Sequence, residues 1–126
     1  MEKCELIETK TAKGISEKFA QKIMDIEAAE LEKHFKNDYI ICLFHEGKEM
    51  NSNEFAWFLR KIPSSSIRGI TFVVGGFLGL EERILKRADA LLSLSRMTFS
   101  HELIRIMLLE QIYRSLMIIQ GRQYIK

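Results

Sequence analysis

Residues 70–80 read ITFVVGGFLGL, and this stretch decides the fold. Its first five residues, 70–74, read as a strand. Three glycines follow between Gly75 and Gly79, where glycine permits positive φ and a close approach of the backbone. A short helical pattern comes next, at about 80–88. The stretch therefore predicts a strand, a tight turn and a helix in succession.

The same alternation continues on both sides of this stretch. Further strand patterns occur at 4–8, 39–44 and 90–94, and further helix patterns at 15–36, 51–61 and 101–120. The continuous apolar run at 39–44 is typical of a buried parallel strand. Alternating strands and helices are typical of a mostly parallel sheet with helices on both of its faces. We therefore expect an α/β fold that forms a single domain over residues 1–126.

Specific residues give the expected helix boundaries. Asn51, with Glu54 three residues later, resembles a capping box at a helix start. Gly121 supplies a helix stop. The last helix is apolar on most of its sides, which predicts that a partner subunit covers part of it. The helix at 15–36 is expected because apolar residues recur among lysines and glutamates, at Ile15, Phe19, Ile23, Ile26, Leu31 and Phe35.

The composition excludes several classes of protein. With 126 residues, 47% hydrophobic and 29% charged, the chain resembles one folded domain rather than a disordered or disulfide-rich protein. Cys4 and Cys42 lie in apolar strand-like runs and fit buried thiols in a reducing cytosol better than a metal site. The sequence contains no apolar signal-peptide core and no uncharged run that would span a bilayer. We expect a cytoplasmic protein without a membrane segment or a metal.

The charge is unevenly distributed. Residues 1–59 carry eight lysines, no arginine and twelve acidic residues, a net charge of −4. Residues 60–126 carry all eight arginines and three lysines against five acidic residues, a net charge of +6. Because the planar guanidinium suits phosphate, the second half is compatible with an anionic partner such as nucleic acid. An ordinary solvated surface explains the same charges equally well.

The predicted topology indicates where a ligand would bind. In open α/β sheets, ligands bind beyond the carboxyl ends of the strands, which here are the segments 44–48, 75–79 and 94–99. The glycines at 75–79 have neither the spacing of a dinucleotide fingerprint nor the lysine of a P-loop. Taken alone, they are explained more readily by a tight turn than by a ligand site, because turns are the commonest use of glycine.

Three strings of residues carry a family resemblance: 72–80 (FVVGGFLGL), 92–105 (LSLSRMTFSHELIR) and 109–115 (LEQIYRS). LFHEGK at 43–48 precedes them and YIK at 124–126 follows them. In this order they closely resemble the ribosomal RNA large subunit methyltransferase H family, of the SPOUT class of knotted methyltransferases. The resemblance covers essentially the whole chain and is most specific over the three longer strings.

This resemblance implies a fold with a C-terminal trefoil knot, an exception to the rule that chains do not knot. It also implies methyl transfer from S-adenosylmethionine to N3 of a pseudouridine in large-subunit (23S) ribosomal RNA, on the assembled ribosome, by a homodimer. By motif match, the cofactor contacts fall on Leu43, Gly75, Leu94, Ser95, Arg96, Met97, Thr98 and Phe99. The candidate catalytic residues are His101, Arg114 and Tyr124.

Plain structural explanations exist for the same three residues. His101 can be a helix-start residue, Arg114 can form an ordinary helix ion pair with Glu110, and Tyr124 lies on a tail. Cofactor binding needs apolar walls and backbone polar groups, which the matched segments can supply, and it needs no metal.

The sequence departs from the family pattern at several places. A preceding strand and helix that members usually have are not matched, Ser100 replaces a common proline, and the glycine turn contains Phe77-Leu78. Phe44 stands where the family has an acidic residue, and Ile125 where it has a histidine. The departures leave open a non-catalytic ribosome- or RNA-binding relative. A plain nucleotide-binding or signalling domain ranks last, because it lacks the expected acidic cluster and glycine spacing.

Overall fold

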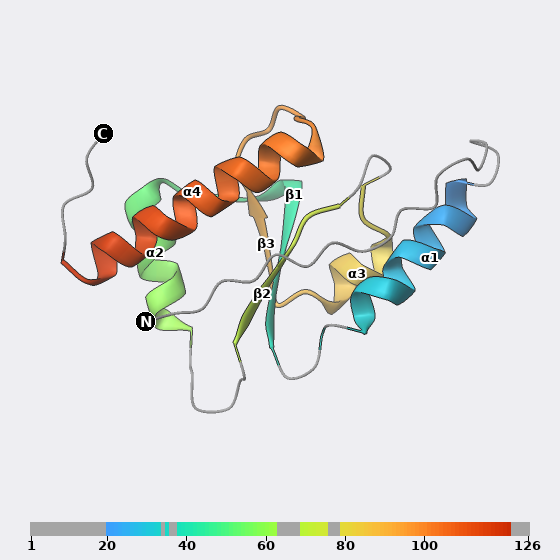
Figure 1. Cartoon of the computed structure of the whole chain (residues 1–126), viewed down its shortest axis with the longest axis horizontal. Coiled ribbons are helices and arrows are strands. Elements are labelled where there is room, and N and C mark those ends of the chain that lie inside the picture. The colour runs from blue at the N-terminus through green and yellow to red at the C-terminus, as the bar shows by residue number, and fades with distance from the viewer. Residues whose placement is uncertain (1–19, 34, 36–37, 63–68, 76–78, 122–126) are drawn as a thin grey trace.

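The structure is a computed structural model and describes residues 20–33, 35, 38–62, 69–75 and 79–121. Its elements in chain order are α1 (Ala20–Glu32), β1 (Tyr39–Glu49), α2 (Ser52–Lys61), β2 (Ile70–Val73), α3 (Glu82–Arg87), β3 (Ala90–Ser93) and α4 (His101–Ile119) (Figure 1). The predicted alternation from residue 39 onward is confirmed. The predicted strand at 4–8 and the predicted helix start at 15–19 lie outside the described residues.

The described strands form a three-stranded parallel sheet in the order β2-β1-β3. Two aspartates fix its amino-terminal edge. Asp89 Oδ2 accepts a hydrogen bond from Ile40 N at 2.7 Å, and Asp89 N donates to Ile40 O at 2.8 Å. On the other side, Thr71 Oγ1 donates to Asp38 Oδ2 at 2.5 Å. These bonds hold the strands in register at the edge opposite their carboxyl ends.

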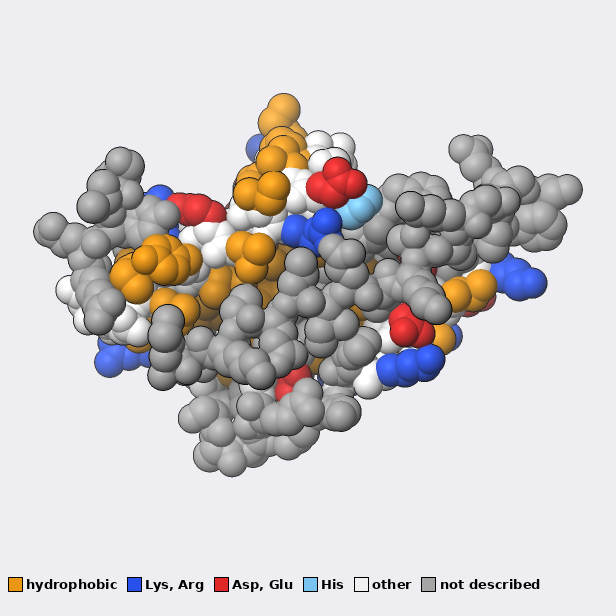
Figure 2. All heavy atoms as spheres, viewed as in Figure 1, with side chains coloured by type: hydrophobic (Ala, Val, Ile, Leu, Met, Phe, Trp, Pro, Cys, Tyr) orange, Lys and Arg blue, Asp and Glu red, His pale blue; other side chains and the backbone are white. Residues whose placement is uncertain are grey.

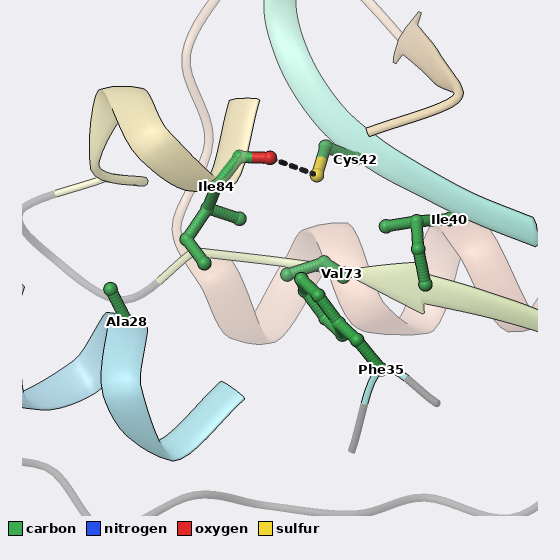
Figure 3. Close-up of a cluster of buried hydrophobic side chains, with 6 residues drawn as sticks. All are labelled: Ala28, Phe35, Ile40, Cys42, Val73 and Ile84. Carbon is green, nitrogen blue, oxygen red and sulfur yellow. Dashed lines mark hydrogen bonds between the residues drawn. The ribbon is translucent and has the colours of Figure 1, made fainter. Parts of the chain in front are cut away.

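Helices cover both faces of the sheet, as the sequence predicts. Figure 1 shows α1 and α3 on one side of the strands and α2 and α4 on the other. In β1 the side chains alternate, so that Ile40 and Cys42 pack toward α1 and α3 whereas Ile41 packs toward α2 and α4. Figure 3 shows the first of these two clusters, in which Ile84 of α3 also takes part. Each of the three isoleucines is fully buried and contributes roughly 1.5–3 kcal/mol to folding.

The central strand is longer than predicted, because β1 continues to Glu49 rather than ending near residue 44. Leu92 of β3 is the register partner of both Leu43 and Lys48, so the residues between them form a wide bulge. Gly47 lies in this bulge against the backbone of β3. A Cβ there would lie 2.7 Å from the carbonyl carbon of Leu91. The strand therefore resumes pairing only because residue 47 has no side chain.

The first helix also differs from the prediction. It ends at Glu32, and Phe35 is buried beyond the helix, with its N–H donating to Glu32 O at 3.2 Å. Ile26, predicted to lie on the apolar face, is 44% exposed. The residues that pack inward are instead Glu27 and Ala28, at 8% and 1% exposure. The apolar face of α1 is therefore rotated by one residue and includes a carboxylate.

One helix start and one helix end follow the predicted signals, and a second helix start has a cap that was not predicted. Asn51 Oδ1 accepts from Glu54 N at 2.7 Å while Glu54 Oε1 accepts from Asn51 N at 2.8 Å, which completes the capping box of α2. Ser100 caps α4, because its Oγ accepts from Leu103 N at 3.2 Å. Gly121 ends α4 with a φ of 73°.

Candidate cofactor site at the strand ends

The three segments that the motif match selected lie at one edge of the sheet. Leu43 is in β1, Gly75 follows β2 by two residues, and Leu94 follows β3 by one residue. Because β1 lies between the other two parallel strands, these segments are within about 10 Å of each other across the sheet. Leu43 and Leu94 are half-buried and pack against the same core cluster under α2 and α4. Packed apolar side chains therefore form the base of this edge.

The turn after β2 brings its two glycines into contact. A Cβ at Gly75 would lie 2.8 Å from the carbonyl carbon and 3.1 Å from the carbonyl oxygen of Gly79. Gly79 itself has a φ of 82°, a conformation that L side chains rarely adopt. Both glycines are therefore required by the backbone, and the tight turn predicted from the sequence is confirmed at its two ends.

Hydroxyl groups shape the loop between β3 and α4. Ser93 Oγ donates to Ser95 O at 2.9 Å, and Ser95 Oγ accepts from Met97 N at 3.0 Å. Ser100 then caps the helix that follows. The loop backbone is therefore held by its own side chains, and no large side chain of the loop is needed to fold it.

The other side chains of this loop face solvent. Met97 is 72% exposed and Phe99 39% exposed, and Thr98 is exposed as well. Arg96 is also exposed and lies 3.8 Å from Glu49, at the end of β1. Figure 2 shows hydrophobic side chains projecting over the loop between β3 and α4 seen in Figure 1. Exposed apolar side chains on a well-held loop are what a ligand wall requires.

His101 stands at the entrance to α4, directly after this loop. It is half-exposed, and its Nε2 lies 3.7 Å from Glu102 Oε1. Its closest electrostatic partner across the fold is Glu27 of α1. Burial raises the pKa of Glu27, and the positive charge of His101 opposes this rise. The helix start thus faces a buried acid of α1.

Arg114 does not meet His101 within one chain. Thirteen residues of α4 separate them, which at about 1.5 Å per residue is about 20 Å. Arg114 Nη2 forms an ion pair with Glu110 Oε1 at 2.7 Å, as the helix spacing predicted. Tyr124 lies outside the described residues. Of the two candidate catalytic residues that the structure describes, His101 begins the helix that follows β3, and Arg114 lies farther along the same helix.

Glu27 is a candidate site residue that the sequence reasoning missed. The signal was present, because position 27 continues the four-residue spacing of Ile15, Phe19, Ile23, Leu31 and Phe35. A single glutamate at an apolar position of a helix rich in exposed glutamates is easily overlooked. It borders a small hollow lined by Met24, Glu27, Ala28, Leu31, Val74, Gly75, Gly79, Leu80, Glu81 and Ile84.

The described residues contain neither a metal-binding cluster nor a membrane-spanning helix. Among them, no three His, Cys, Asp or Glu side chains come together as a metal ion would require. None of the described helices is both long and apolar enough to cross a membrane.

The fold and the site define a class of protein: a parallel α/β protein whose ligand edge has apolar walls, a glycine turn and a buried carboxylate. These groups suit a cofactor that has an aromatic base and cationic groups, as S-adenosylmethionine does. Comparison with known families narrows the class. The family described as Predicted SPOUT methyltransferase matches residues 1–124, and the chain belongs to this family. SPOUT methyltransferases use S-adenosylmethionine as methyl donor.

Similar proteins come from several streptococci and are named ribosomal RNA large subunit methyltransferase H. The protein of Streptococcus uberis is 43% identical over 123 residues, which cover 97% of this chain and 77% of that protein. The protein of Streptococcus agalactiae is 42% identical over 127 residues, with 100% and 80% covered. The protein of Streptococcus thermophilus is 42% identical over 129 residues, with 99% and 79% covered.

Proposed function

We propose that this protein transfers a methyl group from S-adenosylmethionine to N3 of a pseudouridine in large-subunit ribosomal RNA, acting on the assembled ribosome. The observation that carries the proposal is the arrangement of three residues of the family motif across the sheet. Gly75 and Leu94 follow the ends of β2 and β3, and Leu43 lies in β1 between these strands, at the last paired residue before its bulge. The names of the streptococcal relatives support the class of RNA. Residues 94–99, with Leu43 and Gly75, hold the cofactor in this proposal.

The reaction forms a bond between the methyl carbon and N3, breaks the bond between that carbon and sulfur, and removes the proton of N3. The cofactor supplies the methyl group as an electrophile on its sulfonium. The chain must hold both reactants in line and accept the proton, tasks that proximity and a nearby base accomplish. His101 is the candidate base, because an imidazole nitrogen can accept a proton and the helix that begins at His101 directly follows the cofactor loop.

The proposal includes a homodimer that α4 builds. Leu103, Ile106, Leu109 and Tyr113 are 41–65% exposed and lie within an arc of about 120° on this helix. Such a continuous apolar face is typical of a subunit interface. Arg114 borders the same face, so two α4 helices packed in opposite directions would bring the partner subunit's Arg114 toward His101. In such a dimer, His101 and the partner subunit's Arg114 would lie near each other, although the two residues of one chain are about 20 Å apart.

Three further features belong to the same proposal and rest on family membership. Residues 1–126 form one SPOUT domain, its C-terminal segment forms a trefoil knot, and the protein works in the cytoplasm. Tyr124, carried by that segment, joins His101 in the active site.

Methyl transfer to ribosomes tests the proposed activity. Large ribosomal subunits and whole ribosomes that lack the modification are incubated with the protein and S-adenosylmethionine labelled in its methyl group. We expect label in a single pseudouridine as its N3-methyl derivative, identified by nuclease digestion and mass spectrometry. The Streptococcus uberis relative serves as the positive control. Cofactor and ribosome binding without transfer, while the relative is active, would favour the non-catalytic alternative that Phe44 and Ile125 suggest.

Mass in solution tests the dimer. The chain mass is 14.7 kDa, so light scattering should report about twice that value for the wild-type protein. Ile106→Glu places a charge on the proposed interface, at a residue 65% exposed in one chain, and should yield monomers that remain folded. Ile26→Glu, at 44% exposure on α1, is the matched control and should leave the dimer intact. A wild-type monomer, or a dimer unaffected by Ile106→Glu, would contradict this interface.

A further inference from the structure

The hollow between α1 and the turn after β2 contains a largely buried carboxylate, that of Glu27. Glu27 is 8% exposed and forms no hydrogen bond or ion pair with another described residue. A second acid in the hollow, Glu81, lies 3.6 Å from Arg83, which also pairs with Glu32 at 3.1 Å. The buried Oε2 of Glu81 has no hydrogen-bond partner among the described residues. The positive charge of His101 in α4 acts on Glu27, but the effect of burial is larger and the pKa of Glu27 is raised.

A buried carboxylate without a partner is costly to the folded protein. Removing a charge from water destabilises the folded state unless an opposite charge or hydrogen bonds compensate it. The remaining walls near Glu27 cannot do so, because Ala28, Leu31 and Ile84 are apolar (Figure 3 shows Ala28 and Ile84). The arrangement is consistent with a cationic ligand group that completes the hollow when it binds.

The hollow meets the strand-end segments at Gly75, a motif position that borders it, and Gly79 lies against Gly75 across the turn. A cofactor placed on the strand ends therefore has the acidic side chains of this hollow, Glu27 and Glu81, close to the motif position Gly75.

We propose that Glu27 binds the cationic methionine end of S-adenosylmethionine, so that α1 contributes to a cofactor site that the sequence motif assigns to the strand ends alone. The inference rests on the proposed function and deepens it. Two positive groups lie in that part of the cofactor, the sulfonium and the α-ammonium group, and the carboxylate complements either. Glu27 is thus a cofactor-binding residue in addition to the motif residues.

Calorimetric titration of the full chain tests the inference. Glu27→Gln keeps the shape of the side chain and removes its charge, and it should bind S-adenosylmethionine about 10- to 150-fold more weakly, the range for a hydrogen bond to a charged group. Glu30→Gln is the matched control on the same helix, because Glu30 pairs with Lys33 at 3.1 Å on the surface, and it should bind as the wild type does.

The same titration with S-adenosylhomocysteine, which lacks the sulfonium charge, identifies the group involved. An equal loss for both ligands assigns Glu27 to the ammonium group, and a larger loss for S-adenosylmethionine assigns it to the sulfonium. Glu27→Asp keeps the charge and should bind the cofactor more tightly than Glu27→Gln does. If circular dichroism shows that Glu27→Gln is misfolded, Glu27→Asp is compared with the wild type instead.

Two outcomes separate this inference from the proposed function. Wild-type affinity in Glu27→Gln, or an affinity of Glu27→Asp as low as that of Glu27→Gln, would overturn the role of Glu27 and leave the proposed function standing. Failure of the wild-type chain to bind either ligand, while the streptococcal relative binds them, would overturn both.

Discussion

Replacement of Gly75 by alanine tests how tightly the turn after β2 must close. The new Cβ would lie 2.8 Å from the carbonyl carbon of Gly79 and 3.0 Å from Leu80 Cγ. The leucine side chain can move, but the carbonyl carbon belongs to the backbone of a turn whose other end has a positive φ. The substitution therefore overpacks the turn, which costs about 1–3 kcal/mol. At about 4 °C per kcal/mol for a domain of this size, we expect thermal unfolding about 4–12 °C lower.

The cofactor affinity should change by a related amount. If the turn relaxes outward to accommodate the methyl group, the cofactor can bind only by closing it again. The strain of about 1–3 kcal/mol is then subtracted from the binding free energy, which makes binding about 5- to 150-fold weaker. Calorimetric titration with S-adenosylmethionine measures this directly, and differential scanning calorimetry measures the stability.

Gly69→Ala is the matched control for this substitution. Gly69 precedes β2, and a Cβ there would meet only Asp38 Oδ1, at 4.0 Å. We expect its stability and affinity to stay within error of the wild type. Full stability and full affinity in Gly75→Ala would refute the reasoning, because they would mean that the turn is open enough to hold a side chain.

Three other predictions concern single side chains. Asn51→Ala removes the side chain that accepts from Glu54 N at 2.7 Å and should lower the free energy of unfolding by about 1 kcal/mol in denaturant titration; an unchanged value would contradict the cap. Burial raises the pKa of Cys42 to about 11, so in a Cys4→Ser variant the remaining thiol should resist aromatic disulfide reagents at pH 8 until the protein unfolds. The pKa of Glu27 is higher in the folded than in the unfolded protein, so ionisation of Glu27 destabilises the folded state once the pH rises above the unfolded pKa. Glu27→Gln should therefore raise the melting temperature at pH 7 and not at pH 3. An equal effect at both pH values would contradict this.

The order of elements could be predicted because local signals agree with the tertiary structure. The strand pattern at 70–74 became β2, and the cap at Asn51 starts α2 where the sequence places it. The continuation of β1 beyond Phe44 could not be predicted, because it depends on Gly47 lying against the backbone of β3. No local pattern reveals that contact between distant segments. From the sequence alone, β1 is expected to end at its last apolar residue.

Part of the candidate site could likewise be predicted from the sequence, and part of it could not. The ends of β2 and β3 could be located from the parallel-sheet rule, whereas the segment 44–48 lies inside β1 and not beyond its end. The residues at 94–99 were found from the family motif. Glu27 was not found, because periodicity alone does not decide whether Ile26 or its neighbour faces the core. The position of Arg114 relative to His101 follows from helix length, yet a candidate catalytic role for both only makes sense with a second subunit.

Hydrogen–deuterium exchange with and without S-adenosylmethionine tests the central claim most directly. If the cofactor binds at the strand ends, added cofactor should protect amides in three segments, 43–48, 74–80 and 94–100, and the α1 peptide that contains Glu27. The α2 peptide Ser52–Lys61, on the opposite face from α1, should exchange as before. Protection confined to α2, or cofactor binding that leaves all three strand-end segments unprotected, would contradict the account.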